Sequence, residues 1–488
     1  MEKSRICLAL TESTIEANVN LIWKYRDSID MAELRADFLD PYQLAYIFKF
    51  PSLVDLPVIL TFRRKFDGGK FDGSESERLN LINQALIGRF AFIDLENDTR
   101  DVVLERKIRE KGMRIIRSLH DFKGVPENLD SRLRDLAARS DELPKVAVMP
   151  RSTADLVKII KCAQEVPLKD KILIGMGDYG FATRILSTKL GSYLTFCSAP
   201  GGQKAAPGHI DPDMLDEIYR FRNIGRETKV YGIIGNPIMH TASPAIHNTG
   251  YRLLDIDAVY VPFLVDKLPD FLPLISLLDI RGFSVTIPHK EAIIQHLSGK
   301  EPGLDDIGAC NTVEKSGRGL KGSNTDAPGF IAPLEQCLAE ALTGLKATVI
   351  GAGGSARAVV YALVKKGVEV LILNRTVERA QQLADLFGCR CASLDRDGTR
   401  LMESYSDIIV QTTSVGMEPD INGDPVKEYD FKGHEIAYDL VYKPAMTCFL
   451  QRAEEAGCRI IQGREMLLHQ AYAQFYRFTG REYPDTEE

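Results

Sequence analysis

Lys145 is the first residue of the sequence whose type and place suggest chemistry. It lies in "LPKVAVMP" (143–150), a run of small apolar residues that predicts a buried strand. Burying an ammonium group is costly. Desolvation favours the neutral amine, and a neutral lysine amine attacks a ketone to form an imine. The alternative is a lysine at the start of a strand whose aliphatic stem carries the ammonium out to solvent.

His120 supplies the partner that imine chemistry needs. It directly follows "MRIIRSL" (113–119), the apolar run before that of Lys145, so neighbouring strands can bring the two side chains together. A Schiff base beside a proton-transfer group can remove a proton next to a ketone. Strand alternation places Ala147 on the same face as Lys145, which leaves room there. The pair favours a Lys145 that forms an imine and does not pair with a fixed charge, over a lysine that only reaches solvent.

Lys290 and Asp326 suggest a second chemistry. Lys290 ends the strand-like "GFSVTIPHK" (282–290), and Asp326 lies in "GSNTDAPGF" (322–330). Such polar turns are also common without a function, because Asn, Asp and Ser are frequent turn residues. The functional interpretation places the two side chains beside a ketone that is being reduced. The ammonium would donate a proton to the developing alkoxide, and the carboxylate would orient it.

A glycine-rich turn in "VIGAGGSARA" (349–358) is typical of a dinucleotide site. Glycines let the backbone approach a pyrophosphate, and the following helix N-terminus supplies amides. One such turn is weak evidence, since plain strand-to-helix loops use it too. The next strand ends at Arg375, with Arg379 a helical step later, where an NAD site would carry an acidic residue. Arginine suits a 2′-phosphate, which predicts NADP; the alternative is an arginine exposed to solvent.

The first ~220 residues contain eight apolar runs, which we expect to be the strands that position Lys145 and His120. Strands that alternate with helices in this number predict a (β/α)8 barrel, and an eight-stranded doubly wound sheet is the alternative. Chemistry in such barrels lies at the carboxyl ends of the strands. The runs are 5–10, 30–37, 57–62, 90–96, 113–119, 144–150, 171–177 and 192–197. Polar residues near their ends are Glu33, Arg35, Arg63, Asp94, Glu96, His120 and Arg184.

A polar stretch at 221–228 marks the expected junction to a second α/β unit. The predicted domains are the barrel at 1–225, a smaller α/β substrate domain at 226–335, and a Rossmann NADP domain at 336–464. The predicted C-terminal helix at 465–488 returns to the substrate domain.

Composition argues against several classes of protein, namely those that bind nucleic acid, span a membrane or hold a metal ion. The 488 residues carry a net charge of −7, which argues against a nucleic-acid-binding surface. No apolar run is long enough to span a membrane, and we expect no signal peptide because the apolar run near residue 8 is short. Nine scattered cysteines, with no CxxC, fit a reduced cytoplasm. The eight histidines show no metal-ligand spacing, so no metal is expected.

The first ~220 residues resemble the type I 3-dehydroquinate dehydratases. The motifs are "ELRAD" (33–37), "TFRRKFDGG" (61–69), "SLHDF" (118–122), "PKVAVMP" (144–150), "GMGDYGFATR" (175–184) and "AAPGHI" (205–210). The resemblance implies an imine on Lys145, with His120 as general base and acid. It also implies substrate contacts from Glu33, Arg35, Arg63, Arg184, Ala205 and His209. The chain departs from the family with Asp67 for Glu, His209 for Gln and Ala205 for Ser.

The chain from ~229 onward resembles shikimate dehydrogenases. The motifs include "GNPIMHTASPAIHN" (235–248), "GACNTV" (308–313), "TTSVGM" (412–417), "DLVYKPAMT" (439–447) and "GREMLLHQAYAQF" (463–475). The resemblance implies that Lys290 and Asp326 are catalytic. Implied substrate contacts are Thr241, Ser243, Thr286, Asn311, Tyr442 and Gln470. Expected NADP contacts are Gly351, Ala352, Gly353, Gly354, Ser355, Ala356, Asn374, Arg375, Thr376, Arg379, Thr412, Thr413 and Gly463. Departures are Thr241 for Ser, Ser284 for Asn and Gln411 for Asn.

The two resemblances imply consecutive reactions on small molecules. The first half would dehydrate 3-dehydroquinate to 3-dehydroshikimate, and the second would reduce that product to shikimate with NADPH. Two rivals stay open: a regulatory protein that binds these metabolites without turnover, and a catabolic quinate/shikimate dehydrogenase that uses NAD. Loss of a reactive residue would mark the first rival, and Arg375 argues against the second. The oligomeric state is left open.

Overall fold

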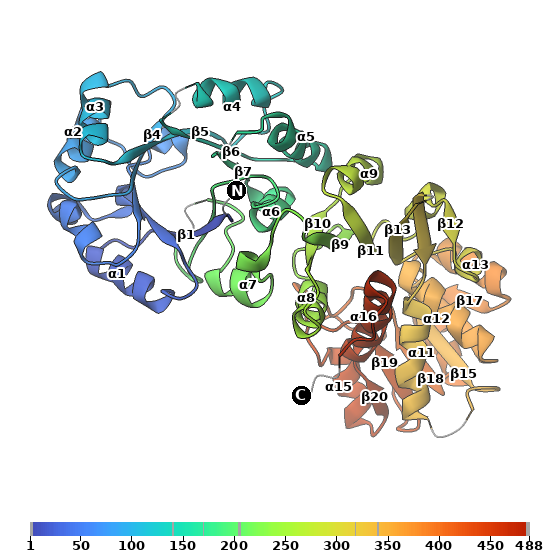
Figure 1. The fold of residues 1–488 in the computed structure, drawn as a ribbon. Coiled ribbons are helices and arrows are strands. Elements are labelled where there is room, and N and C mark those ends of the chain that lie inside the picture. The colour runs from blue at the N-terminus through green and yellow to red at the C-terminus, as the bar shows by residue number, and fades with distance from the viewer. Residues whose placement is uncertain are drawn as a thin grey trace. The chain divides into compact units, whose positions relative to one another are not determined.

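The computed structural model describes residues 3–138, 141–168, 170–203, 206–317, 319–338 and 341–484. The chain divides into two compact units, residues 1–281 and 282–488, which are described separately (Figure 1). The predicted domain limits at 225/226 and 335/336 stay predictions.

Eight parallel strands form the barrel that the sequence predicts. Their order is β7-β6-β5-β4-β3-β2-β1-β8, and a parallel bridge between Lys171 and Ser192 lies at the seam between the two end strands. The strands are β1 (Arg5–Leu10), β2 (Met31–Arg35), β3 (Val58–Thr61), β4 (Phe92–Glu96), β5 (Arg114–Asp121), β6 (Leu143–Val148), β7 (Ile172–Gly175) and β8 (Leu194–Cys197). The doubly wound alternative is therefore wrong.

Helices cover the outside of these strands (Figure 1). They are α1 (Ile15–Lys24), α2 (Glu75–Ala85), α3 (Val102–Glu110), α4 (Leu129–Ala137), α5 (Thr153–Glu165), α6 (Gly177–Ile185) and α7 (Pro212–Glu217). Local sequence sets where they begin. Ser74 and Glu77 form a reciprocal capping box at the start of α2, and Ser152 caps α5.

The first unit continues beyond the barrel. It contains β9 (Lys229–Gly235), α8 (Ser243–Leu253), β10 (Ala258–Leu264) and α9 (Leu268–Leu277), and β9 pairs in parallel with β10. Asp266 Oδ1 accepts hydrogen bonds from Thr153 N at 2.9 Å and from Thr153 Oγ1 at 2.6 Å. Gln164 Nε2 donates to the Leu277 carbonyl at 2.5 Å. These bonds join α5 of the barrel to the segment that follows it.

The second unit begins inside β11 (Ile280–Val285). Residues 282–284 of β11 pair antiparallel with β13, which pairs antiparallel with β14, and β14 pairs in parallel with β12. These elements are β12 (Gly299–Lys300), α10 (Leu304–Ile307), β13 (Thr312–Ser316), β14 (Gly319–Ser323) and α11 (Asp326–Cys337).

A six-stranded parallel sheet of order β17-β16-β15-β18-β19-β20 forms the rest of this unit. The order is that of a Rossmann-like sheet, as predicted. Its elements are β15 (Lys346–Ile350), α12 (Gly354–Lys365), β16 (Glu369–Asn374), α13 (Val377–Phe387), β17 (Arg390–Ser393), α14 (Arg396–Leu401), β18 (Ile408–Gln411), β19 (Ile436–Asp439), α15 (Cys448–Glu455) and β20 (Arg459–Ile461).

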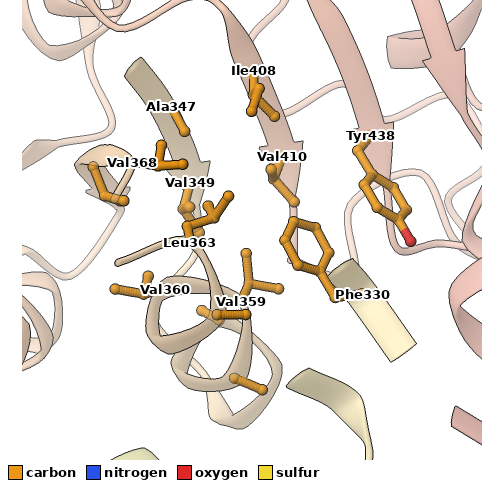
Figure 2. Packing of buried hydrophobic residues seen from close by; sticks show 14 of the residues in the cluster. Phe330, Ala347, Val349, Val359, Val360, Leu363, Val368, Ile408, Val410 and Tyr438 are labelled. Atoms are coloured by element: carbon orange, nitrogen blue, oxygen red, sulfur yellow. The ribbon is translucent and has the colours of Figure 1, made fainter. Parts of the chain in front are cut away.

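The core of this sheet explains why its strands read as continuous apolar runs. Val349 and Val410 lie on neighbouring central strands, and Val359 and Leu363 of α12 pack over them (Figure 2). The ring of Phe330 stacks on that of Tyr438, with centroids 4.9 Å apart. A parallel strand that is buried on both faces carries apolar residues at successive positions, without polar alternation.

The C-terminal helix differs from its predicted range of 465–488. α16 (Gly463–Thr479) begins two residues earlier and ends well before the C-terminus. Gly480 follows it with φ 71°, the left-handed conformation in which glycine ends helices. α16 packs against α11, and a Cβ at Gly329 would lie 2.9 Å from the backbone nitrogen of Gln470.

No helix in the described ranges has the length and apolar character needed to cross a membrane. Within the same ranges, no three His, Cys, Asp or Glu side chains are grouped so that they could hold a metal ion.

Candidate active sites

One cavity inside the barrel collects most residues predicted for the first site. Lys145, His120, Arg184 and His209 line it together. The other lining residues are Glu33, Arg35, Arg63, Asp67, Gly68, Phe122, Ala147, Ile174, Met176, Phe196 and Ala206. Ala205 lies outside the described residues. The inward direction of Lys145 and the neighbouring position of Ala147 follow the predicted strand alternation.

Lys145 differs from the prediction in one respect. Its Nζ lies 2.9 Å from Asp94 Oδ2 and 3.5 Å from Glu33 Oε1, so the lysine pairs with fixed carboxylates. The expectation that it would have no such partner is wrong. The side chain is only 4% exposed, and a buried ammonium requires a counter-charge. The ring of Phe196 lies on another side, with its centroid 4.5 Å from Nζ.

Asp94 is a site residue that the sequence placed at a strand end without giving it a role. Its Oδ1 accepts from Arg63 Nη2 at 2.8 Å and from Ser118 Oγ at 2.5 Å, while Oδ2 faces Lys145. Burial opposes ionisation, but the charges of Arg63 and Lys145 outweigh it and hold the pKa of Asp94 well below its usual range. Asp94 is therefore a carboxylate at neutral pH.

A second ion-pair layer lies behind Arg63. Its Nη1 contacts Glu96 Oε1 at 2.8 Å, and Glu96 Oε2 lies 2.8 Å from Nη1 of the fully buried Arg78. Arg63 thus has two carboxylate partners of its own. Alternating strand positions could have indicated Asp94 and Glu96, because both leave β4 on the inner face.

His120 lies in β5, where it pairs in register with Ala147 of β6. Its Nδ1 has no hydrogen-bond partner among the described residues. Burial, followed by the positive charges of Arg63 and Lys145, lowers the pKa of His120 well below its usual value, although Asp94 acts against this. The imidazole is therefore neutral at pH 7 and available to accept a proton.

Arg184 is the one predicted arginine of this site without an acidic partner among the described residues. Arg35 pairs with Asp37 at 2.8 Å, whereas Arg184 donates only to the carbonyls of Phe196 and Pro207, each at 3.2 Å. Its Nε has no partner in the same ranges. Burial lowers the pKa of Arg184 to about 10, which leaves it charged at neutral pH. A buried cation without a counter-charge suits an anionic ligand.

Asp67, which stands where the family usually has Glu, faces another partner. Its Oδ2 accepts from Arg64 Nε at 2.6 Å, and Arg64 also pairs with Asp98 at 2.8 Å. Asp67 still lines the cavity through the turn that ends at Gly68.

A second cluster forms in the other unit around Lys290. Its Nζ donates to Asp326 Oδ2 at 2.6 Å and to Ser355 Oγ at 3.1 Å. Asn311 Nδ2 donates to Asp326 Oδ1 at 2.7 Å and lies 3.5 Å from Gln470 Oε1. All but Ser355 are buried. Four residues predicted as catalytic or substrate-binding therefore meet in one hydrogen-bonded group.

The remaining predicted substrate residues belong to different parts of the chain. Thr241 and Ser243 are in the first unit, where Thr241 Oγ1 donates to Ser243 Oγ at 3.2 Å. Thr286 is half-buried between β11 and Lys290, and its carbonyl accepts from His289 N at 2.9 Å. Tyr442 is half-buried after β19. Their contacts with a substrate stay predictions.

Ser284, where the family usually has Asn, forms a hydrogen bond with a residue of α16. Its Oγ donates to Gln474 Oε1 at 2.8 Å, and Gln474 Nε2 donates to Thr312 Oγ1 at 3.0 Å and to the Asn311 carbonyl at 3.2 Å. The shorter serine therefore still joins a network that holds Asn311.

The glycine turn between β15 and α12 has the features of a phosphate-binding loop. Gly351 has φ 114°, and a Cβ there would lie 2.4 Å from Thr412 Oγ1. At Gly353 a Cβ would meet nothing within 4 Å, so the backbone is open to a ligand. A Cβ at Gly354 would lie 3.2 Å from Lys290 Cβ. The turn therefore lies next to Lys290; Ala352 precedes α12, and Ser355 and Ala356 are in its first turn.

The end of β16 presents positive charge. Arg375 and Arg379 are exposed, and neither forms an ion pair within the described ranges. Asn374 Nδ2 donates to the carbonyl of Thr376 at 2.8 Å, which fixes the turn that carries Arg375. Arginine side chains suit a 2′-phosphate, and the contacts of Arg375 and Arg379 with NADP stay predictions.

Gln411 organises the next loop. Its Oε1 accepts from Thr413 N at 2.7 Å and from Thr413 Oγ1 at 2.9 Å, and its Nε2 donates to the Val415 carbonyl at 2.9 Å. Thr412 Oγ1 donates to the Ile350 carbonyl at 2.7 Å. A Cβ at Gly463 would lie 2.6 Å from the Val441 carbonyl, so the start of α16 passes close to this edge.

Comparisons with known proteins match four family models to successive stretches of the chain. Family models match Type I 3-dehydroquinase over residues 6–226 and the shikimate dehydrogenase substrate binding domain over residues 233–313. Models of shikimate/quinate 5-dehydrogenase and of the shikimate 5′-dehydrogenase C-terminal domain match residues 334–434 and 463–487.

Individual proteins match one half or both. The chain is 34% identical to the chloroplastic bifunctional 3-dehydroquinate dehydratase/shikimate dehydrogenase of Arabidopsis thaliana, over 98% of this chain and 82% of that protein. It is 40% identical to an NADP(+) shikimate dehydrogenase of Caldanaerobacter subterraneus, over 53% of this chain and 94% of that protein. The crystal structure of shikimate dehydrogenase from Aquifex aeolicus matches with a TM-score of 0.50 and 35% identity, over 54% and 96% of the chains.

Proposed function

The chain belongs to the family of bifunctional 3-dehydroquinate dehydratase/shikimate dehydrogenases, and we propose that its two sites act one after the other. The first dehydrates 3-dehydroquinate to 3-dehydroshikimate. The second reduces 3-dehydroshikimate to shikimate with NADPH, in the shikimate pathway. The observation that carries this proposal is that both reactive sets are complete. Lys145 and His120 line one cavity, and Lys290 and Asp326 form a 2.6 Å pair.

Lys145 attacks the substrate ketone as the neutral amine and expels the carbonyl oxygen as water, which leaves an imine. The ammonium must first give up a proton, which the neutral imidazole of His120 accepts and passes on to the carbonyl oxygen that leaves as water. Asp94 is a poor acceptor because its pKa is held well below the usual range, so its function is to orient Nζ. The protonated imine then withdraws electrons and makes the neighbouring carbon more acidic.

His120 removes the proton from that carbon and returns one to the departing hydroxyl. The low pKa of its imidazole keeps the ring neutral before the step, as a general base requires. Arg184 holds the substrate carboxylate, because its charge has no acidic partner among the described residues. Glu33 and Arg35 line the cavity where the substrate hydroxyls would lie.

Lys290 and Asp326 act on the second ketone. NADPH, when bound, supplies the hydride. Lys290 donates a proton to the oxygen that becomes the hydroxyl, and Asp326 orients the ammonium for this transfer. Asn311 and Gln470 supply further hydrogen-bonding groups beside them for the ring hydroxyls. The open backbone at Gly353 and the cations Arg375 and Arg379 are the residues that would hold the pyrophosphate and the 2′-phosphate.

The rivals fit less well. A protein that only binds these metabolites would not need both pairs of reactive residues, Lys145 with His120 and Lys290 with Asp326. An enzyme that uses NAD would not need Arg375, because NAD lacks the 2′-phosphate. We also propose a cytoplasmic location on the basis of nine cysteines that form no disulfide in the described chain.

Both activities can be tested in one reaction mixture. Purified chain with 3-dehydroquinate and NADPH should produce shikimate while NADPH is consumed in equal amount. Accumulation of 3-dehydroshikimate alone would refute the second activity, and unchanged 3-dehydroquinate would refute the first.

A further inference from the structure

Ser355 connects the start of α12 to the side chain of Lys290. It is the second residue of that helix, and its Oγ accepts a hydrogen bond from Lys290 Nζ at 3.1 Å. Lys290 Nζ also donates to Asp326 Oδ2 at 2.6 Å, so two of its three N–H groups have partners among the described residues. The third N–H group is left for the oxygen of a ligand, and Ser355 is one of the two residues that set its direction.

The hydroxyl proton of Ser355 is not used in this contact. A hydroxyl can donate one hydrogen bond while it accepts others. No acceptor for this O–H group is found in the part of the chain that the structure describes. Ser355 is half-buried, and a Cβ at Gly353, two residues earlier, would meet nothing within 4 Å. A phosphate oxygen bound at the start of α12 is the kind of acceptor that the hydroxyl lacks.

Two further contacts hold the start of α12 against the segment that carries Lys290. A Cβ at Gly354 would lie 3.2 Å from Lys290 Cβ, which is a close approach. Arg357 Nη2 pairs with Glu291 Oε2 at 3.3 Å. The position of Ser355 relative to Lys290 is therefore set by packing and by an ion pair, in addition to their own hydrogen bond.

The other partners of Lys290 do not make this connection. Asp326 Oδ1 accepts from Asn311 Nδ2 at 2.7 Å, and Asn311 lies 3.5 Å from Gln470 Oε1. Within the described ranges, neither Asp326 nor Asn311 forms a hydrogen bond with residues 351–358. Ser355 is thus the side chain through which the glycine turn reaches the ammonium.

We propose that Ser355 is a positioning residue that couples the two ligands of the dehydrogenase site, because its O–H group donates to a phosphate of the bound dinucleotide while its Oγ orients Lys290 Nζ toward the substrate oxygen. This rests on the proposed dehydrogenase function and gives one residue a role toward both ligands. A hydroxyl that donates to an anion becomes a better acceptor. The bound dinucleotide therefore strengthens the hold on Lys290 and raises the affinity for shikimate, and by linkage shikimate raises the affinity for the dinucleotide equally.

Calorimetry with shikimate and NADPH tests this coupling. Both compounds are already reduced, so neither can pass a hydride to the other, and binding is measured without turnover. The Kd of shikimate for the full chain is measured without NADPH and with saturating NADPH. In the unmodified chain NADPH should lower this Kd roughly fivefold, the effect of one hydrogen bond. Ser355→Ala should bring the ratio of the two Kd values close to one, and Ser355→Thr, which keeps the hydroxyl, should preserve the fivefold ratio.

Ser404→Ala, at an exposed serine of the same unit, is the matched control and should also keep the fivefold ratio. The same ratio in Ser355→Ala as in the unmodified chain, or a ratio of one in the unmodified chain, would overturn the role of Ser355 while the dehydrogenase function stands. A ratio lost in Ser355→Thr as well would assign the coupling to the shape of the side chain and overturn the role of the hydroxyl.

Failure of the unmodified chain to bind NADPH, or to oxidise shikimate with NADP, would overturn the proposed function itself. If Ser355→Ala does not fold, Ser355→Cys takes its place, because a thiol is a weak donor and a weak acceptor. The ratio should fall in that variant too, and an unchanged ratio would contradict the proposal.

Discussion

Each half of the chain buries a lysine against an aspartate, and the neighbours of the pair decide its chemistry. Lys145 shares Asp94 with Arg63 and Ser118, and it has a second carboxylate 3.5 Å away in Glu33. Lys290 has one carboxylate partner among the described residues, Asp326, at 2.6 Å. In the barrel a cation competes for the aspartate, whereas in the second unit an amide and a hydroxyl complete the group.

This difference explains how one residue type can serve two reactions. The aspartate beside Lys145 is shared with Arg63, and the ring of Phe196 lies against Nζ on another side. Among the described residues Asp326 contacts no other cation, so it can orient Nζ of Lys290 for proton donation. The comparison predicts a nucleophile at Lys145 and a proton donor at Lys290.

Removing the nucleophile should have the largest effect. Lys145→Ala should lower the dehydration rate by about four orders of magnitude or more, because loss of a covalent nucleophile removes the route and not one contact. The appearance of 3-dehydroshikimate measures this. Shikimate oxidation by NADP in the same variant is the control and should stay near that of the unmodified chain. Loss of both activities in a folded variant would contradict the separation of the two sites.

Asp326→Asn should reverse the pattern with a smaller effect. The variant keeps the shape of the side chain but removes the charge that orients Lys290, so shikimate oxidation should fall roughly a hundredfold or more. Its dehydratase rate should not change. Circular dichroism checks that the buried lysine left without a partner has not unfolded the second unit. Full oxidation activity would show that Lys290 needs no carboxylate.

The NADP contact should have a moderate effect. Arg375→Ala should raise the KM for NADPH roughly tenfold, as expected for one charge-assisted contact, and leave the KM for NADH unchanged. Arg396→Ala removes an exposed arginine from α14 and is the matched control. An equal change in the KM for NADPH and for NADH would mean that Arg375 does not bind the 2′-phosphate.

The link between the barrel and the following segment should have the smallest effect. Asp266→Ala removes bonds to Thr153 at the start of α5 and should lower the free energy of unfolding by about 1 kcal/mol at pH 7. These bonds outweigh burial and lower the pKa of Asp266, so its contribution is present at neutral pH and is lost as pH falls below about 4. Urea unfolding measures the difference, and Asp270→Ala on α9 is the control. A deficit at pH 3 as large as that at pH 7 would contradict the ionic origin.

Sequence patterns were sufficient for the architecture, and the residues that they predict to react lie together in the structure. Strand alternation oriented Lys145 correctly, and the glycine turn identified the start of α12. The partners of those residues were harder to predict. Asp94 lies 51 positions from Lys145, and only the closed barrel brings them together. The end of α16 at Thr479 depends on a single left-handed glycine, which an amphipathic pattern does not reveal.

Borohydride trapping tests the contrast between the two lysines most directly. Borohydride added while the chain turns over 3-dehydroquinate should reduce the imine to a stable amine, and peptide mass spectrometry should locate the adduct. The account predicts the ligand on Lys145 and none on Lys290, with no adduct in Lys145→Ala. An adduct on Lys290, or none on Lys145 during active turnover, would contradict it.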